Sequence, residues 1–260
     1  MQKFLWDGDK AAAISLTFDD GMQSHIDTAV PLLEKYGLRG TFYITGSGED
    51  YGRQALMRFR PTYEAGHEIG NHSIHHWCSS AGVMAPDHRG LEYRTLGEME
   101  EELLEADRRF KAVFPEVRRW TFCYPCYNTF VGKGLNRRSY VPIVASNFFA
   151  ARAGGEIGNS INSPYHTDLH CLNSFKCEQR GAAELIGLVE QTANQGGWSI
   201  LTFHGIGDGH LLVARSDFEE VLAHLDGARN RIWTAPLIRI AEYLHDNKAM
   251  PANTRGESCD

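Results

Sequence analysis

The stretch Ile14-Ser15-Leu16-Thr17-Phe18-Asp19-Asp20-Gly21 joins an apolar strand to two adjacent carboxylates and a glycine. The segment that follows, residues 22–36, is predicted to be helical. Two neighbouring acids at a strand end repel each other, and no fold requires both. Asp-Gly is also a common turn dipeptide, so the stretch taken alone fits a solvated turn equally well. Residues elsewhere in the chain therefore have to show whether this stretch is a simple turn or part of a functional site.

Length and composition exclude several classes of protein. A chain of 260 residues is most simply one domain with a sizeable core. Its formal net charge of -7 argues against nucleic acid as a partner. No apolar run approaches the ~20 residues that span a bilayer. The first ten residues lack a signal-peptide pattern, so a cytoplasmic location is expected. We predict a single domain over residues 1–245 and a flexible tail over residues 246–260.

Short apolar runs alternate with amphipathic segments along the whole chain, which indicates a parallel α/β sheet or barrel. Capping boxes mark helix starts at residues 95–98 and 216–219, and Pro236 marks a third. In such folds the chemistry lies at the carboxyl ends of the strands. The predicted strands are Ile14–Phe18, Gly40–Ile44, Glu68–Asn71, Arg119–Tyr124, Val141–Ser146, Trp198–His204 and Ile232–Ala235.

Six cysteines are present, at positions 78, 123, 126, 171, 177 and 259. Without a secretion signal, free thiols are expected rather than disulfides. Cys123 and Cys126 form a C-x-x-C pair, which can indicate redox chemistry or half of a zinc site. Cys171 and Cys177 do not have the spacing of a second half. Inert packing is therefore the favoured interpretation of the pair.

Histidines after the third and sixth predicted strands suggest a metal site. His72 and His76 are spaced i, i+4, which would place both imidazoles on one side of a helical turn. Two imidazoles and one carboxylate make an open catalytic zinc site, and Asp20 is the natural third ligand. His75 is an alternative partner at i, i+3, and a histidine-rich loop turning away from the sheet is the plain alternative. His204 ends a buried strand, where it is either a proton donor or acceptor or a satisfied structural histidine.

These motifs together resemble the polysaccharide deacetylase family, the nodulation-protein-B homology domain of carbohydrate esterase family 4. Thr17 to Gly21 is similar to the family's first motif, T-F-D-D-G, and His72 to His76 to its second, H-[ST]-x-x-H. The late strand that ends in His204 is similar to a further motif of the family, in which a strand ends in a histidine. The resemblance implies a distorted (β/α) barrel, commonly with seven strands.

Carried over residue by residue, the resemblance implies that Asp19 is the general base and His204 the general acid. It further implies that Asp20, His72 and His76 hold a divalent metal. Zinc is the expected ion, and cobalt or nickel would suit the same ligands. Ser73 is expected to tie down the loop that carries the two histidines.

The chain departs from the family pattern in two places. Cys123 stands where the family often has an arginine that orients the catalytic aspartate. Arg152, expected just after the fifth predicted strand, is our candidate replacement. The family's Asp-Trp pair that tunes the late histidine has no counterpart in residues 146–162, and Asp208 or Asp217 is a possible substitute.

The resulting prediction is a metal-dependent hydrolase that removes the acetyl group from an N-acetylated sugar. An oligosaccharide, a polysaccharide or a carrier-linked sugar would each fit as substrate. Two alternatives stay open. One is hydrolysis of another C–N amide or an O-acetyl ester on the same barrel, and the other is a catalytically silent carbohydrate-binding homologue. The sequence makes no prediction of oligomeric state.

Overall fold

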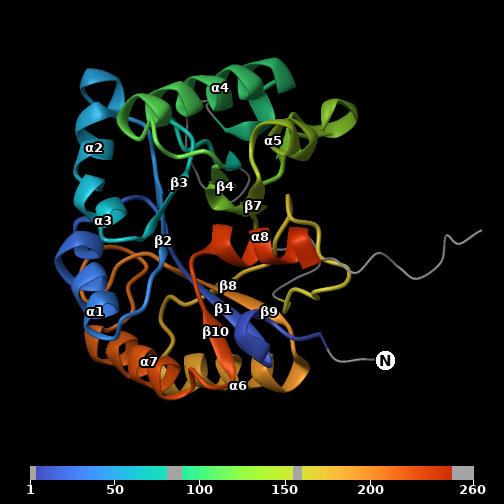
Figure 1. Ribbon diagram of the computed structural model, residues 1–260. Helices are drawn as coiled ribbons and strands as arrows, with labels where there is room; N and C mark the ends of the chain where they lie inside the picture. The colour runs from blue at the N-terminus through green and yellow to red at the C-terminus, as the bar shows by residue number, and fades with distance from the viewer. Residues whose placement is uncertain (1–3, 81–89, 155–159, 248–260) are drawn as a thin grey trace, which may run out of the picture.

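The computed structural model describes residues 4–80, 90–154 and 160–247. A parallel sheet forms its centre, and helices surround that sheet (Figure 1). The parallel strands are β1 (Ala12–Phe18), β2 (Thr41–Ile44), β3 (Glu68–Asn71), β4 (Thr121–Cys123), β7 (Ala150–Arg152), β8 (Phe175–Lys176), β9 (Trp198–Phe203) and β10 (Ile232–Thr234). A separate antiparallel pair consists of β5 (Phe130–Val131) and β6 (Arg138–Ser139).

Seven of the parallel strands follow one path, in the order β7-β4-β3-β2-β1-β9-β8. On one side of β1, its first three residues pair with β10 and its last two pair with β2. Both strands can share this side because β2 diverges from the beginning of β1. At the far end, Arg152 forms a parallel bridge with Leu172, and the Ala153 N–H donates to the Leu172 carbonyl at 2.8 Å. The chain that leads into β8 thus joins the two ends of the path. The architecture is the expected distorted (β/α) barrel.

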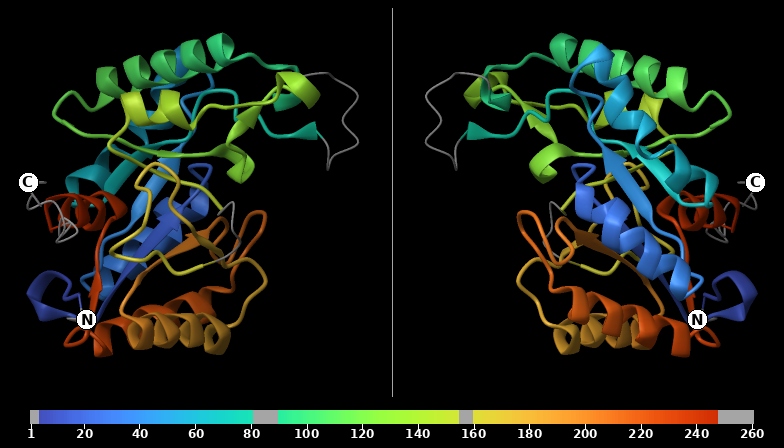
Figure 2. Two further views of the ribbon diagram at one scale, coloured as in Figure 1. Left: turned by 90° about the vertical axis from the view of Figure 1, so that its right-hand side faces the viewer. Right: turned by 90° about the vertical axis from the view of Figure 1, so that its left-hand side faces the viewer.

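Helices cover the outer face of the sheet, and α6 and α7 lie side by side (Figure 2). The helices are α1 (Val30–Lys35), α2 (Arg53–Met57), α3 (Arg60–Glu64), α4 (Leu96–Val113), α5 (Val141–Asn147), α6 (Ala182–Gln195), α7 (Arg215–Gly227) and α8 (Leu237–Asn247). No helix in the described part of the chain has both the length and the apolar composition that crossing a bilayer demands. Most of the predicted tail lies outside the described residues.

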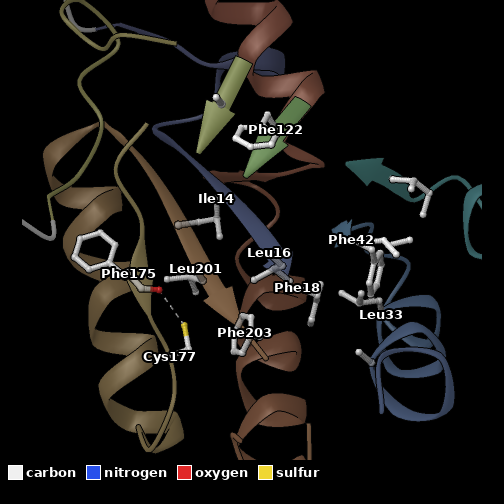
Figure 3. Packing of buried hydrophobic residues seen from close by; sticks show 14 of the residues in the cluster. Ile14, Leu16, Phe18, Leu33, Phe42, Phe122, Phe175, Cys177, Leu201 and Phe203 are labelled. Atoms are coloured by element: carbon white, nitrogen blue, oxygen red, sulfur yellow. Dashed lines mark hydrogen bonds between the residues drawn. The ribbon is translucent and has the colours of Figure 1, made fainter. Parts of the chain in front are cut away.

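The alternating side chains of β1 explain how the barrel positions its acids. Ile14, Leu16 and Phe18 pack in the large apolar cluster between the sheet and the helices (Figure 3). The intervening residues Ser15 and Thr17 belong to the other face and are buried, with their hydroxyls bonded to backbone carbonyls at 3.1 Å. Successive strand side chains point to opposite faces. Asp19 therefore continues the inward-facing row, and it is 3% exposed.

Several predicted elements differ in the structure. Residues 141–147 form helix α5, because Pro142 lies in its first turn and Val144 is its only buried residue. The strand of this region is β7, three residues long. Residues 22–36 begin as a π-helix, His25–Ala29, and continue as α1. The capping box at Thr95 is confirmed, whereas the one predicted at Ser216 is wrong, since α7 begins at Arg215 without a side-chain cap.

Candidate metal and catalytic site

The two acids that end β1 point in different directions. Asp19 is buried in the barrel interior, whereas the side chain of Asp20 is 23% exposed at the strand ends. Asp20 and Gly21 both have left-handed backbone conformations, with φ of 73° and 61°. Asp tolerates this region better than most residues, and glycine adopts it without strain. The turn therefore leaves Asp19 in the inward-facing row of β1 and places Asp20 at the strand ends.

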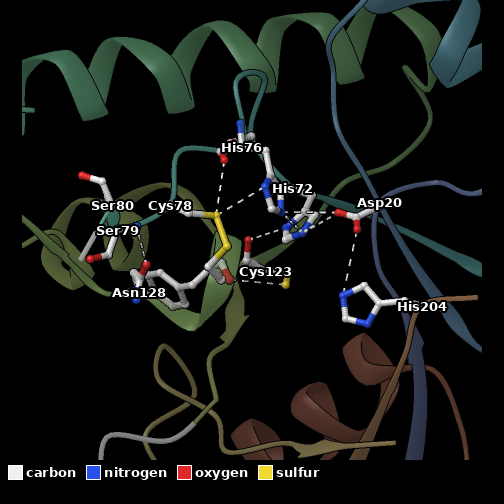
Figure 4. The surroundings of a disulfide bond; sticks show 12 residues. Asp20, His72, His76, Cys78, Ser79, Ser80, Cys123, Asn128 and His204 are labelled. Carbon is white, nitrogen blue, oxygen red and sulfur yellow. Dashed lines mark hydrogen bonds and ion pairs between the residues drawn. A yellow bond between two sulfur atoms is a disulfide. The ribbon is translucent and has the colours of Figure 1, made fainter. Parts of the chain in front are cut away.

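Asp20, His72 and His76 meet at the mouth of the barrel (Figure 4). The Nε2 atoms of the two histidines are 3.1 Å apart. The Oδ1 atom of Asp20 lies 3.5 Å from His72 Nε2 and 3.4 Å from His76 Nε2. Zinc bonds of about 2.0–2.1 Å in tetrahedral geometry would place ligand atoms about 3.3 Å apart. The three side chains therefore have the separations that a divalent cation requires.

The hydrogen bond of His72 determines which ring nitrogen is available. Its Nδ1 lies 2.9 Å from the Cys123 carbonyl oxygen, which can only accept, so Nδ1 carries the proton. Nε2, the nitrogen left for a ligand, then faces His76 and Asp20. Metal-binding histidines in proteins use their second nitrogen in this way, donating to a carbonyl or carboxylate. The residues present thus fit a cation at this position.

The two histidines are brought together by an irregular loop, so the predicted helical turn is wrong. Ser73 and His76 have φ of 63° and 50°. The Ser73 hydroxyl accepts the His76 N–H at 3.1 Å, as expected. The buried Glu102 of α4 accepts the N–H groups of Ile74 and His75 at 2.9 and 2.7 Å. Glu102, which sequence reasoning missed, thus fixes the loop from outside the barrel.

His75 itself faces away from the three candidate metal ligands. Its side chain is 59% exposed, its Nδ1 lies 2.6 Å from Glu102 Oε2, and its ring stacks on Trp77. Its alternative role as a ligand partner of His72 has no support in this geometry.

Arg152 contacts Asp19 inside the barrel. Its Nη2 bonds both carboxylate oxygens, and its Nη1 donates to Thr202 Oγ1 at 2.9 Å. Arg152 is fully buried. Burial alone would raise the pKa of Asp19, but the Arg152 guanidinium holds it below the ordinary value. The carboxylate is therefore ionised and held in one orientation, as a base would have to be.

Cys123, which stands where the resemblance implied an arginine, lies beside Arg152. Cys123 and Arg152 are register partners on β4 and β7, and Cys123 Sγ is 2.7 Å from Arg152 Nη2. Cys123 is buried, and burial raises the pKa of its thiol. The guanidinium thus approaches the aspartate from the neighbouring strand. Arg152 lies on a strand rather than after one, because the predicted fifth strand is a helix.

His204 follows β9 and faces the same mouth. Its Nε2 lies 4.0 Å from Asp20 Oδ2, and its Nδ1 is buried with no hydrogen-bond partner among the described residues. His25 Nδ1 accepts the Met22 N–H at 3.2 Å, so the His25 Nε2–H donates to the His204 carbonyl at 2.8 Å. Burial lowers the pKa of His25 to about 4, so this ring is neutral. The buried His25, which sequence reasoning missed, connects the loops after β1 and β9.

The possible substitutes for the Asp-Trp pair do not contact His204. Asp208 accepts the N–H of Gly209, and Asp217 accepts the N–H of Ala182 at the start of α6. A different histidine was missed instead. His210 Nε2 lies 3.0 Å from Asp20 Oδ2. Its only signal in the sequence is a histidine six residues beyond His204, in a glycine-rich segment.

A disulfide joins Cys78 to Cys126, so the expectation of free thiols is wrong for these two residues. The bond connects the loop that carries His76 to the turn after β4 (Figure 4). Cys123 and Cys177 are unpaired thiols in the barrel, and Cys259 lies outside the described residues. Disulfides are most common in oxidising compartments. The cytoplasmic location stays a prediction.

Comparison with known proteins gives the same family. A family model described as polysaccharide deacetylase matches residues 7–130. A gellan lyase from Bacillus sp is 25% identical over 263 residues, with coverage of 92% of this chain and 10% of that protein. Peptidoglycan-N-acetylmuramic acid deacetylase PdaA from Bacillus subtilis is 37% identical over 68 residues, covering 26% and 25%. The chain thus spans a tenth and a quarter of these relatives.

Solved structures share the fold at low identity. A putative polysaccharide deacetylase from Mycobacterium smegmatis superposes with a TM-score of 0.63 at 16% identity over 99% of both chains. A family 4 pseudoenzyme from Bacillus anthracis gives 0.55 at 12%, covering 88% of this chain and 65% of that one. A cobalt complex of a family 4 acetyl xylan esterase from Clostridium thermocellum gives 0.52 at 16%, covering 88% and 89%. The predicted resemblance to the polysaccharide deacetylase family is thus supported by the family model over residues 7–130 and by the shared fold.

Proposed function

We propose that this protein is a metal-dependent deacetylase that hydrolyses the N-acetyl amide of an acetylated sugar. The observation that carries the proposal is the triangle of Asp20, His72 and His76, with edges of 3.1 to 3.5 Å, beside the separately held carboxylate of Asp19. A divalent cation at this triangle, zinc or alternatively cobalt or nickel, would polarise an amide carbonyl and acidify a bound water.

Asp19 is assigned the role of general base. It is ionised, it is the immediate neighbour of a proposed ligand, and Arg152 holds both of its oxygens. A carboxylate so placed can take a proton from the water that attacks the acetyl carbon. Arg152 acts through Asp19 and is therefore a positioning residue. Its contacts to Thr202 and Ser174 fix the guanidinium in turn.

His204 is assigned the role of proton donor to the departing amine. The C–N bond breaks as the amine nitrogen gains this proton. The attacking water supplies the second carboxylate oxygen of the acetate that is released. Burial lowers the pKa of His204, and Asp19 and Asp20 offset that only in part. The neutral imidazole has to take up a proton before it can donate one. Its unpartnered Nδ1 leaves the ring without a fixed tautomer.

The similarity to a relative named peptidoglycan-N-acetylmuramic acid deacetylase supports an acetylated sugar as the substrate class. Hydrolysis of an O-acetyl ester or of another amide is an outcome that the test has to distinguish. So is catalytic silence, because one structural neighbour is a pseudoenzyme.

Acetate release measures the proposed reaction directly. The full chain would be stripped with a chelator, reloaded with zinc and incubated with N-acetylglucosamine oligomers, O-acetylated xylan and a simple amide. We expect release from the N-acetylated sugar, its loss on chelation, and its loss in Asp19→Asn and His72→Ala. Asp27→Asn is the matched control, because Asp27 is exposed and accepts a hydrogen bond from the side chain of Gln23. Undiminished acetate release in Asp19→Asn would refute the assignment of Asp19 as the base. Failure to release acetate from every substrate would refute the proposal that the protein is an enzyme of this kind.

A further inference from the structure

The Asp20 carboxylate lies between two pairs of histidines. Its Oδ1 atom faces His72 and His76, at 3.5 and 3.4 Å from their Nε2 atoms. Its Oδ2 atom faces His204 and His210, at 4.0 and 3.0 Å from theirs. Figure 4 shows the first pair on one side of Asp20 and His204 on the other. An ionised carboxylate accepts at both oxygens, so each oxygen can serve a separate partner.

The loop after β9 returns His210 to this carboxylate. The Gly205 N–H donates to the His210 carbonyl at 3.0 Å, and the Val213 N–H donates to the Gly205 carbonyl at 2.9 Å. A Cβ at position 205 would lie 2.2 Å from the Asp208 carbonyl oxygen, so only glycine permits this closure. The ring centroids of His204 and His210 are 5.6 Å apart. The backbone thus presents a second pair of imidazoles to Asp20.

The second set has the donor types of a cation site. Asp20, His204 and His210 offer ligand atoms that all lie within 4.8 Å of one another. The distances from Asp20 Oδ2 to His210 Nε2 and His204 Nε2, 3.0 and 4.0 Å, lie on either side of the about 3.3 Å that tetrahedral zinc bonds imply. The first set is tighter and more buried: the His72 side chain is 2% exposed, whereas that of His210 is 58% exposed. A cation would therefore bind the second set more weakly.

We propose that Asp20, His204 and His210 form a second divalent-cation site, of the zinc type, whose occupation inhibits the enzyme. The inference rests on the proposed function, in which His204 must carry and release a proton. An imidazole nitrogen bound to a cation has no lone pair for that proton. The first zinc equivalent would then activate the protein and the second would inhibit it. Zinc rather than magnesium is expected, because imidazole nitrogens suit zinc and magnesium prefers oxygen ligands.

Metal stoichiometry tests the site without reference to activity. Chelator-stripped full chain would be titrated with Zn²⁺ by calorimetry and with Co²⁺ by visible absorption, and bound metal would be measured after desalting. We expect two steps in the wild type. In His210→Ala the weaker step alone should lose affinity, by about 10–100-fold or more. His245→Ala is the matched control, because His245 also forms an exposed pair with a carboxylate, Asp246, at 3.1 Å.

His210→Gln separates a ligand from a hydrogen-bond donor. Glutamine can still donate to Asp20, but its amide is a poor zinc ligand. If His210 serves only as a hydrogen-bond partner, His210→Gln will bind zinc as the wild type does, and the proposal fails. It also fails if the wild type binds one equivalent. The proposal is supported if acetate release falls once more than one equivalent of zinc has been added, and if this fall is smaller in His210→Gln. Two equivalents with no acetate release at any zinc level would refute the proposed function and leave the second site standing.

Discussion

Replacing Arg152 with alanine is the sharpest test of how the site is built. Arg152 is fully buried and bonds both oxygens of Asp19, whose side chain is 4% exposed. Breaking a buried ion pair by removing one partner costs about 3–5 kcal/mol, because the remaining charge has no compensation. Arg152→Ala should therefore lower the free energy of unfolding at pH 7 by about that amount.

The same change should alter turnover in a pH-dependent way. Without the guanidinium, burial raises the pKa of Asp19, so the ionised base exists only at higher pH. If between about 1.4 and about 4 kcal/mol of the penalty reaches the transition state, kcat/KM falls between about tenfold and about a thousandfold. The loss should be largest at acid pH and shrink as the pH rises. A merely structural arginine would lower stability without moving the acid limb of the profile.

The assay is acetate release across pH, paired with urea denaturation of each variant. Arg119→Ala is the control, because its partner Glu242 is 3.1 Å away on a half-exposed surface. A relocated arginine, Cys123→Arg with Arg152→Cys, should restore part of the activity, since positions 123 and 152 are register partners. The reasoning is refuted if Arg152→Ala keeps kcat/KM within about threefold of wild type, less than 1 kcal/mol, with an unmoved acid limb.

Three further changes have defined outcomes. Glu102→Ala should weaken zinc binding by about 10–100-fold in a calorimetric titration, because Glu102 fixes the histidine loop through two N–H groups. Cys126→Ser opens a disulfide that spans 48 residues and should cost about 4 kcal/mol of stability in urea denaturation by loop entropy. His67 has a pKa lowered to about 4 by burial, against 6.5 ordinarily, so its stabilising contribution is lost as pH falls through that window. The wild type should lose about 2 kcal/mol between pH 7 and pH 5 from this group, and His67→Asn should remove that part of the slope.

Each of these changes has an internal comparison. Glu101→Ala alters the exposed neighbour of Glu102 and should leave zinc affinity unchanged, so equal losses in both variants would contradict the loop argument. Reductant should lower the melting temperature of the wild type and leave Cys126→Ser unaffected. His166→Asn changes an exposed histidine, and a slope reduced as much as in His67→Asn would show that burial is not the cause.

Local signals in the sequence predicted most of the barrel. The alternation of β1 and the runs that became β2, β3, β9 and β10 were found because buried parallel strands read as apolar segments. The segment 141–147 was predicted wrongly, since its Val and Ile residues favour strands while Pro142 starts a helix. The true strand β7 contains only Ala-Ala-Arg, and a three-residue strand has too few side chains to show a period.

The candidate site also has a part that the sequence predicted and a part that it did not. Asp19, Asp20, His72, His76 and His204 were predictable because they end strands, and parallel strands bring their carboxyl ends to one edge. Sequence alone therefore determined which side chains meet at that edge. Only the tertiary structure decided what surrounds it: the two oxygens of Asp20 between two histidine pairs, and Arg152 on Asp19. The disulfide that anchors the His76 loop was equally invisible in the sequence. These contacts join residues 48 to 190 positions apart, and such pairings depend on how the sheet closes.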